Sequence, residues 1–487
     1  MSEGPDREPS APEGVVRRIV RETTRFAVLQ VVASVVVWVT TLLLTRLLDP
    51  RTFGAYSIGT FFLGLGALLG DGGLGATLLR KKTDIEPEEL QNTLTFLLLL
   101  GATMAAAFLA TMPLIERAWR LQPGEAAVLR LLAPLYLVGP LRVVPYLRLE
   151  RGMDFGRIAR VELAATLTRQ LVAVALAWRY GGVLALAGAQ LSGSAVQLTL
   201  AWRAAPGWPG FALDRAVLSG LLKYGLQVQA LSVAAFFKDN LSAALLGTLL
   251  GPRAVGFFEF GVKYAQVPVQ AVNALGRVQL PVYARLERAD EALYQAIRGA
   301  TRVALVLGVG LLVLLGVAAP AVIPTLYKPQ WLASLPVVYG LAGNMAGGLL
   351  AGPFFVLLQG QGHAGTAIRV FTVWTGLTWA LVAIVWKLGL GAVAGAYSLV
   401  TLGVVAWLIQ WAERHLGRRI RDAYYAPAIA GLCAAAVAVA LAWRLPALSP
   451  WARAPLCLAV YVAALALVEG PSLRREAAAW LRSVRGR

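Results

Sequence analysis

The sequence is poor in the residues that soluble enzymes use for chemistry. It has two cysteines and two histidines among 487 residues, and only 15% of its residues are charged. Cys433 and Cys457 both lie within apolar runs, so neither a disulfide framework nor a metal site is predicted. With only His363 and His415 available, histidine-based acid–base or metal chemistry is close to excluded. The sequence indicates no catalytic residues.

Long polar stretches are also missing. Hydrophobic residues make up 58% of the chain, and apolar runs of about 20 residues, enough to cross about 30 Å of hydrocarbon, recur along almost all of it. No cleavable signal peptide is predicted, because the first 25 residues are polar and then basic and the first apolar run has full membrane length. No loop much exceeds about 15 residues, which leaves no room for an extramembrane catalytic domain. We expect an all-α polytopic membrane protein that is not an enzyme.

An internal repeat organises these apolar runs. Residues Leu47–Phe62 read LLDPRTFGAYSIGTFF, and Leu249–Tyr264 read LLGPRAVGFFEFGVKY, with Pro-Arg and two glycines at the same places. Two further pairs of similar segments follow in the same order, beginning at Ile85 and Glu287 and at Ala177 and Val385. Three matches at nearly one spacing predict a duplicated membrane unit.

The apolar runs predict fourteen transmembrane helices, six in each repeat and two appended after the second. The Pro- and Gly-rich segment from Ala204 to Arg215 is the best linker in the chain. We therefore expect six regions: a basic tail at 1–25, an N-lobe at 26–203, a linker at 204–217, a C-lobe at 218–413, appended helices at 414–469 and a second tail at 470–487.

Proline and glycine predict where these helices bend or approach closely. The second helix is dense in glycine, which indicates close helix packing or a hinge. Prolines inside the predicted helices predict kinks suited to a bundle around a cavity: Pro134, Pro140, Pro268, Pro320 and Pro353. The segment Leu332–Leu358 is predicted as one helix that contains the last of these prolines.

The distribution of Lys and Arg predicts the orientation. Roughly 28 of the 45 basic residues fall in the tails and even-numbered loops, against about 11 in the odd-numbered loops, so both ends are expected in the cytoplasm. Six crossings separate the repeats, so the two copies run in parallel. Parallel repeats are related by a pseudo-two-fold axis along the membrane normal, with substrate bound between them and access alternating.

Ten ionisable residues are predicted inside the membrane, where each costs about 2.5–3.5 kcal/mol unless it faces a cavity or a partner. Six are basic and four acidic, so the cavity should favour anions. Arg169 and Lys238, near mid-bilayer depth, are the best candidates for a cationic site. The acids offer places where protons or sodium ions could bind. The ten residues are Asp71, Arg142, Glu162, Arg169, Lys238, Asp239, Glu259, Lys263, Arg277 and Arg302.

Several of these residues have a simpler interpretation. Glu259 and Lys263 are four apart with the acid first, which is the favourable orientation for an intrahelical ion pair. Arg142, Arg277 and Arg302 lie within two turns of the expected cytoplasmic face. Their side chains could extend to the interface instead of facing a cavity.

Three sets of motifs resemble one family of membrane transporters. The first is LLDPRTFGAY at Leu47–Tyr56 with GDGGLGATLLRK at Gly70–Lys81. The others are FKDNL from Phe237, followed by GPRAVG from Gly251, and YKPQW at Tyr327–Trp331. Between Arg17 and Arg421 the chain resembles the Wzx-type polysaccharide and oligosaccharide flippases of the multidrug/oligosaccharidyl-lipid/polysaccharide exporter (MOP) superfamily.

This resemblance implies two six-helix lobes in a V around a central cavity. It implies that a lipid-linked saccharide, typically on polyprenyl pyrophosphate, moves from the inner to the outer leaflet of a prokaryotic plasma membrane, with a polysaccharide polymerase as a possible partner. The pyrophosphate would meet Arg169, Lys238 and Lys263, and Arg142 and Arg277 would attract it from the cytoplasmic side. The acids Asp71, Glu162, Asp239 and Glu259 would serve a coupling proton or sodium ion, with no other cofactor.

Three other functions remain open at this point. A multidrug or organic-cation antiporter of the same superfamily would need a cavity rich in acids and aromatics, against which the basic excess counts. A membrane polysaccharide polymerase or glycosyltransferase would need a larger extramembrane loop with a catalytic cluster. A non-transporting scaffold that kept the fold is the third alternative.

Overall fold

The computed structural model describes residues 29, 32–71, 74–81, 83–240, 242–270, 272, 291–360 and 364–469. Within these ranges every regular element is a helix, which confirms the predicted all-α class. Nine of the described helices are long and apolar enough to cross a membrane, and a tenth span results if two helices joined at a 50° bend are taken together. The chain is therefore a multi-pass membrane protein.

The contacts divide the chain into two compact units. Unit 1 comprises Met1–Phe236 and Gly247–Gly256, and unit 2 comprises Phe237–Leu246 and Phe257–Arg487. The predicted lobe boundary at 204–217 stays a prediction, since the contacts keep most of the helix after it with unit 1.

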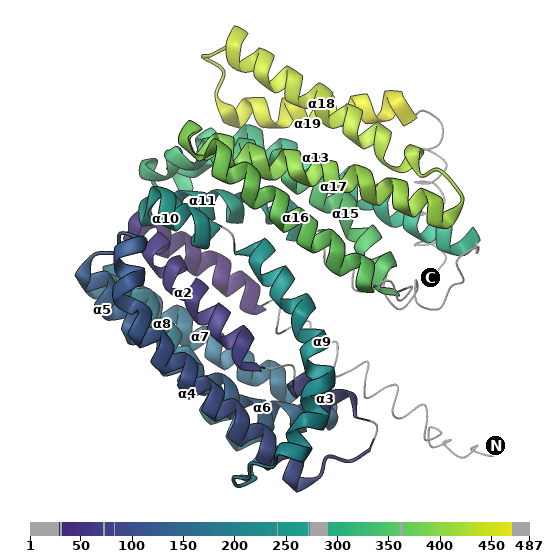
Figure 1. Ribbon diagram of the computed structural model, residues 1–487. Coiled ribbons are helices and arrows are strands. Elements are labelled where there is room, and N and C mark those ends of the chain that lie inside the picture. The colour runs from purple at the N-terminus through teal and green to yellow at the C-terminus, as the bar shows by residue number, and fades with distance from the viewer. Residues whose placement is uncertain are drawn as a thin grey trace, which may run out of the picture. The chain divides into compact units, whose positions relative to one another are not determined.

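Unit 1 begins with a helix at Val32–Leu47 and is built from helices that pack against one another (Figure 1). Buried leucines from four of its helices form one of its cores, around Leu97 and Leu147. The other helices are α2 (Pro50–Asp71), α3 (Leu74–Arg80), α4 (Pro87–Ala118), α5 (Pro123–Arg130), α6 (Leu135–Arg151), α7 (Phe155–Arg179), α8 (Gly182–Ala204), α9 (Arg215–Asp239, which runs on into unit 2), α10 (Gly247–Leu250) and the first turn of α11 (Pro252–Ala265).

Local signals in the sequence fix the ends of several of these helices. Glu86 forms a capping box with Glu89 at the start of α4, and Gln122 does the same with Glu125 at the start of α5. Each helix has proline at its first position, where the missing N–H costs nothing. The turn from α7 to α8 passes through Gly181 and Gly182, at φ +66° and +62°, which glycine adopts without strain.

Unit 2 contains α13, a helix of 32 residues that contacts α15, α18 and α19. The two C-terminal helices lie side by side and pack on α13 (Figure 1). Its described elements are η1 (Ser242–Leu246), the rest of α11, α13 (Glu291–Val322), η2 (Ile323–Tyr327), η3 (Pro329–Ser334), α14 (Leu335–Gly340), α15 (Ala342–Gly360), α16 (Ala364–Val385), η4 (Trp386–Leu388), α17 (Leu390–Leu416), α18 (Arg421–Arg444) and α19 (Pro450–Glu469).

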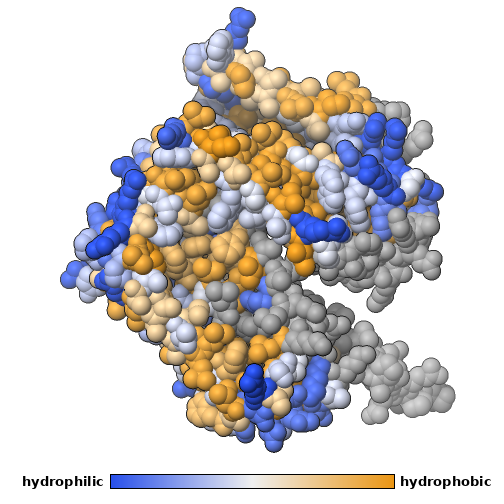
Figure 2. Space-filling model, in the orientation of Figure 1, coloured by the Kyte–Doolittle hydropathy of each residue, from blue (hydrophilic) through white to orange (hydrophobic). Residues whose placement is uncertain are grey.

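The outward surface of the helices is apolar, as a lipid environment requires. Large hydrophobic side chains stand out from α18 and α19, with Leu432 71%, Trp443 86% and Leu467 85% exposed. Hydrophobic colouring covers much of the visible surface of the α-helices of unit 2, whereas hydrophilic residues gather towards its edges (Figure 2). The large share of hydrophobic residues in the composition is therefore explained in part by apolar side chains exposed on the outer surface of the helices.

Two spans are interrupted in the structure. Residues 131–134 separate α5 from α6, and α6 begins directly after Pro134, in agreement with a proline-induced break. The helix expected at Leu332–Leu358 is instead broken at Leu341, between α14 and α15, where no proline lies.

Candidate functional site

The candidate site is a pair of adjoining cavities inside unit 1. The larger has a volume of about 410 Å³ and the smaller about 180 Å³, and Glu162 and Gln197 line both. Arg142 lines the larger cavity and Arg169 the smaller. Two arginines and one carboxylate therefore line these spaces.

Helix α6 shapes the larger cavity through its prolines. Pro140 lacks the N–H that a helix would direct at the carbonyl oxygen of Tyr136, and both residues line the cavity. Gly101 of α4 lets that backbone approach, because a Cβ there would lie 2.4 Å from the Tyr136 oxygen. The Tyr136 hydroxyl donates to the Phe62 carbonyl oxygen at 2.8 Å and so joins α6 to α2. Tyr136 and Pro140 thus form part of the cavity wall that Arg142 also lines.

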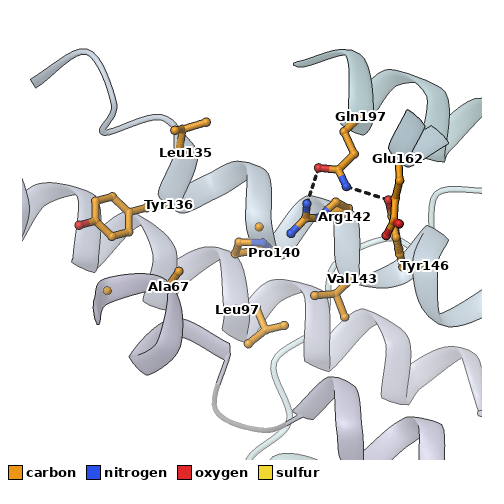
Figure 3. A pocket seen from close by; sticks show the side chains of 12 residues that line it. Ala67, Leu97, Leu135, Tyr136, Pro140, Arg142, Val143, Tyr146, Glu162 and Gln197 are labelled. Carbon is orange, nitrogen blue, oxygen red and sulfur yellow. Dashed lines mark hydrogen bonds between the residues drawn. The ribbon is translucent and has the colours of Figure 1, made fainter. Parts of the chain in front are cut away.

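Arg142 is held in the cavity by a short polar network (Figure 3). Its Nη1 donates to Oε1 of Gln197 on α8 at 2.5 Å, and Gln197 Nε2 donates to the Tyr146 hydroxyl at 2.8 Å. The guanidinium also lies 5.6 Å from the centroid of the Tyr146 ring, within cation–π range. The side chain is thus hydrogen-bonded within unit 1 and lines the larger cavity.

Glu162 is the acid of this network. It lies on α7, is half-buried, and is close enough to Arg142 for the two charges to attract. Because one carboxylate faces two guanidinium groups, the described lining has an excess of positive charge, which favours an anion.

Arg169 lies two turns further along α7 on the same face as Glu162, as their spacing of seven predicts. Its Nε is buried and has no hydrogen-bond partner. Gly193 of α8 makes room for it, because a Cβ there would lie 2.9 Å from the Arg169 Cβ and 3.1 Å from its Nε. A buried polar donor is costly unless it is hydrogen-bonded, so this part of the smaller cavity favours a hydrogen-bond acceptor.

The structure places the other predicted residues differently. Lys263 is exposed on α11 in unit 2. Glu259 accepts a hydrogen bond from the Ser242 hydroxyl, and none of the described ion pairs joins it to Lys263, so the simpler interpretation as an intrahelical pair has no support from the described residues. The backbone of Asp71, Lys238 and Asp239 is helical, but their side chains lie outside the described residues, as does all of Arg277.

Gln197 and Tyr146 were not predicted, because only Asp, Glu, Lys and Arg were considered as candidate site residues. Gln197 is one of two amides in α8, and the available signal was that an amide within a membrane span needs hydrogen-bond partners. Nothing in the sequence pairs Tyr146 with it, because the two residues are 51 positions apart and meet only through the packing of α6 on α8.

The comparisons with known proteins agree with this description. The family model described as "Polysaccharide biosynthesis protein" matches residues 43–336, more than half of the chain. The chain belongs to this family. The resemblance to polysaccharide exporters is thereby confirmed at the level of the family.

Three curated relatives of this family member are similar over part of their length. ExoT, a succinoglycan biosynthesis transport protein of Rhizobium meliloti, is 25% identical over 67% of this chain. TuaB, a teichuronic acid biosynthesis protein of Bacillus subtilis, is 22% identical over 61%. WzxC, a lipopolysaccharide biosynthesis protein of Escherichia coli, is 24% identical over 63%. The chain spans just under two thirds of each relative, between 62% and 66%.

Two solved structures share the fold of this polysaccharide biosynthesis family member. The lipid II flippase MurJ in an inward closed conformation has a TM-score of 0.75 at 12% identity, over 92% of this chain and 99% of MurJ. An inward-facing multidrug resistance MATE transporter of the MOP superfamily has a TM-score of 0.58 at 16% identity, over 81% and 98%. The fold is therefore that of these transporters.

Proposed function

We propose that this protein is a flippase that moves a polyprenyl-pyrophosphate-linked oligosaccharide from the inner to the outer leaflet by alternating access, for cell-surface polysaccharide assembly. The observation that carries the proposal is the positive lining of the adjoining cavities by Arg142 and Arg169. A cation buried among apolar helices is expensive and marks a substrate or ion pathway. Guanidinium groups bind phosphate oxygens in a forked geometry, so a pyrophosphate is the anion that fits them.

The names of the relatives point in the same direction. ExoT is named for succinoglycan transport, and WzxC for lipopolysaccharide biosynthesis. MurJ, which has the same fold, is named for flipping lipid II. A transporter rather than an enzyme follows from these names.

In this proposal the arginines of unit 1 bind the phosphates and Gln197 keeps Arg142 turned into the cavity. Lys238, Lys263 and Arg277 add positive charge along the route, and Arg277 and Arg142 attract the head group from the cytoplasmic side. The acids Asp71, Glu162, Asp239 and Glu259 take up a coupling proton or sodium ion, and no cofactor is needed. An ionised carboxylate beside Arg142 would also weaken anion binding until it is protonated.

The proposed architecture keeps fourteen helices, two parallel six-helix repeats in a V around a central cavity, and two appended helices. Both termini lie in the cytoplasm of a prokaryotic cell, with the protein in its plasma membrane and a polysaccharide polymerase acting on the product. The excess of basic residues in the tails and even-numbered loops supports this orientation.

An ion-coupled antiporter of multidrug or organic-cation type is the alternative on the same fold. The similarity to a MATE transporter concerns the fold, whereas the described cavities present two arginines against one carboxylate. Such a lining repels organic cations. A membrane polysaccharide polymerase has less support still, since the described loops are short.

The test is a translocation assay in reconstituted vesicles with a fluorescent polyprenyl-pyrophosphate saccharide. Arg142→Ala and Arg169→Ala should each lower the initial rate at least about tenfold, because a lost charge-assisted hydrogen bond costs about 1.5–3 kcal/mol. Arg160→Ala is the matched control, since Arg160 lies exposed on the same helix as Arg169 and lines neither cavity. Full activity of both cavity variants, or transport of cationic dyes in place of the saccharide, would overturn the proposal.

A further inference from the structure

A polar contact in unit 2 explains the bend between α14 and α15. The two helices meet at 50° around Leu341, within what would otherwise be one membrane span. In an uninterrupted helix the Asn344 N–H would donate to the Gly340 carbonyl oxygen, four residues earlier. Here the Asn344 N–H donates to Oγ of Ser398 at 2.8 Å, and the Ser398 hydroxyl donates to the Gly340 oxygen at 2.5 Å. A side chain from α17 is thus inserted into the helical ladder.

Two glycines make room for the inserted Ser398 side chain and the α17 backbone. Gly343 leaves space for Ser398, because a Cβ there would lie 3.0 Å from the Ser398 Cβ. Gly340 lets the α17 backbone approach, because its Cβ would lie 2.8 Å from the Gly391 oxygen. One turn along α17, the fully buried Thr401 accepts a hydrogen bond from Asn344 Nδ2 at 2.6 Å. The α14–α15 span therefore contacts α17 at the bend through two polar side chains of α17, Ser398 and Thr401.

Helices kink where a side chain enters the hydrogen-bond ladder, and both ladder groups here remain satisfied through the inserted hydroxyl. Within a membrane there is no water to replace that hydroxyl, and an unsatisfied backbone group costs several kcal/mol. If Ser398 withdraws, the Asn344 N–H and the Gly340 oxygen regain a partner only by bonding to each other. That bond requires a straight helix.

We propose that Ser398 is the positioning residue of a two-state hinge in this span. With the hydroxyl inserted, α14 and α15 are bent; with the hydroxyl withdrawn, the pair straightens and closes the direct Gly340–Asn344 hydrogen bond. The hinge uses sliding of α17 against the span rather than proline or a loop. It stands on these contacts alone and does not depend on what the protein transports.

The test measures the span itself. Spin labels are placed at Ala333→Cys, an exposed site before the bend, and at Gly352→Cys, where a side chain would meet open space, in a chain whose two native cysteines are replaced by alanine. From the helical rise, straightening a 50° bend lengthens this distance by roughly 3 Å. Double electron–electron resonance in nanodiscs should show that increase in Ser398→Ala.

Thr401→Val is the matched control, since it removes the neighbouring polar contact but leaves the inserted hydroxyl, and its distance should equal that of the parent. Gly343→Ala supplies a second route, because its methyl group displaces Ser398 without changing the ladder residues, and it should also lengthen the distance. An unchanged distance in Ser398→Ala, or an equal increase in Thr401→Val, would overturn the proposal. If Ser398→Ala does not fold, Gly343→Ala decides between the same two results.

Discussion

Gly54 of α2 and Gly256 of α11 are in reciprocal backbone contact. A Cβ on Gly54 would lie 1.7 Å from the Pro252 carbonyl oxygen, and a Cβ on Gly256 would lie 1.8 Å from the Pro50 carbonyl oxygen. Each is the first glycine after the Pro-Arg pair in its copy of the repeated sequence. The repeated motif is thus explained physically, since each copy supplies the glycine that the other copy's proline turn requires.

Alanine at either of these glycines should destabilise the protein severely. Overpacking costs about 1–3 kcal/mol in a compliant core, and here the obstacle is backbone, which cannot rotate away. Gly54→Ala and Gly256→Ala should lower the unfolding temperature in detergent or abolish monodisperse protein. Gly376→Ala, in α16 with nothing near its Cβ position, should have almost no effect. Equal tolerance of all three substitutions would refute the contact.

Loss of the Gln197 amide should loosen Arg142 and weaken transport. Gln197→Leu removes the hydrogen-bond acceptor of the Arg142 guanidinium and the donor to the Tyr146 hydroxyl, at a cost of about 1–3 kcal/mol in unfolding free energy. We expect a lower unfolding temperature and a lower translocation rate. Gln190→Leu, two turns away on α8, has no described polar partner to lose and should be nearly neutral. A variant at 197 that matches this control in both measurements would contradict the network.

Substitution of Arg169 should lower translocation without lowering the unfolding temperature, unlike substitution of Gln197. Its buried Nε lacks a partner, so Arg169→Met removes an uncompensated cost and should leave the unfolding temperature unchanged or raised. The same substitution removes the charge offered to the anion and should lower translocation. Thermal unfolding and vesicle transport measured on one preparation separate the two effects. A marked fall in unfolding temperature would show that Arg169 has a structural role.

An ion pair between Arg51 and Glu125 lies at the end of unit 1 where α2 and α5 begin. Arg51 binds Glu125 through two hydrogen bonds, of 2.8 and 3.1 Å, and Glu125 also accepts from the Gln122 N–H as part of the α5 cap. A double-mutant cycle with alanine should give a coupling energy of about 1 kcal/mol, at the upper end for partly exposed pairs. The more exposed Arg130–Glu116 pair, at 3.3 Å, should give less than about 0.5 kcal/mol. The reverse order would contradict this assignment.

Much of the fold can be predicted from the sequence, because membrane helices are recognised by the length and composition of their apolar runs. Apolar runs place the spans, Pro134 places the start of α6, and the two glycines after Tyr180 place the α7–α8 turn. Periodicity also places Glu162 and Arg169 on one face of α7, and their cost in hydrocarbon marks them as candidates.

The remaining features depend on contacts between distant segments. The bend at Leu341 arises from Ser398, 57 residues later, whose hydroxyl has no distinctive sequence context. Gln197 is recruited by a partner on another helix in the same way. Glu259 likewise accepts a hydrogen bond from Ser242, 17 residues earlier, which no local pattern indicates. The local sequence pattern does not show which distant residue a side chain will contact, because that depends on how the helices pack.

The central claim is that the two arginines of unit 1 recognise the charge on a lipid-linked head group. Its most direct test compares vesicle translocation rates of two lipids that carry the same glycan, one on polyprenyl pyrophosphate and one on an uncharged prenyl alcohol. We predict that the wild-type protein prefers the pyrophosphate at least about tenfold and that Arg142→Ala/Arg169→Ala loses this preference. Equal rates for both lipids in the wild type, or a preference that survives the double substitution, would contradict the account.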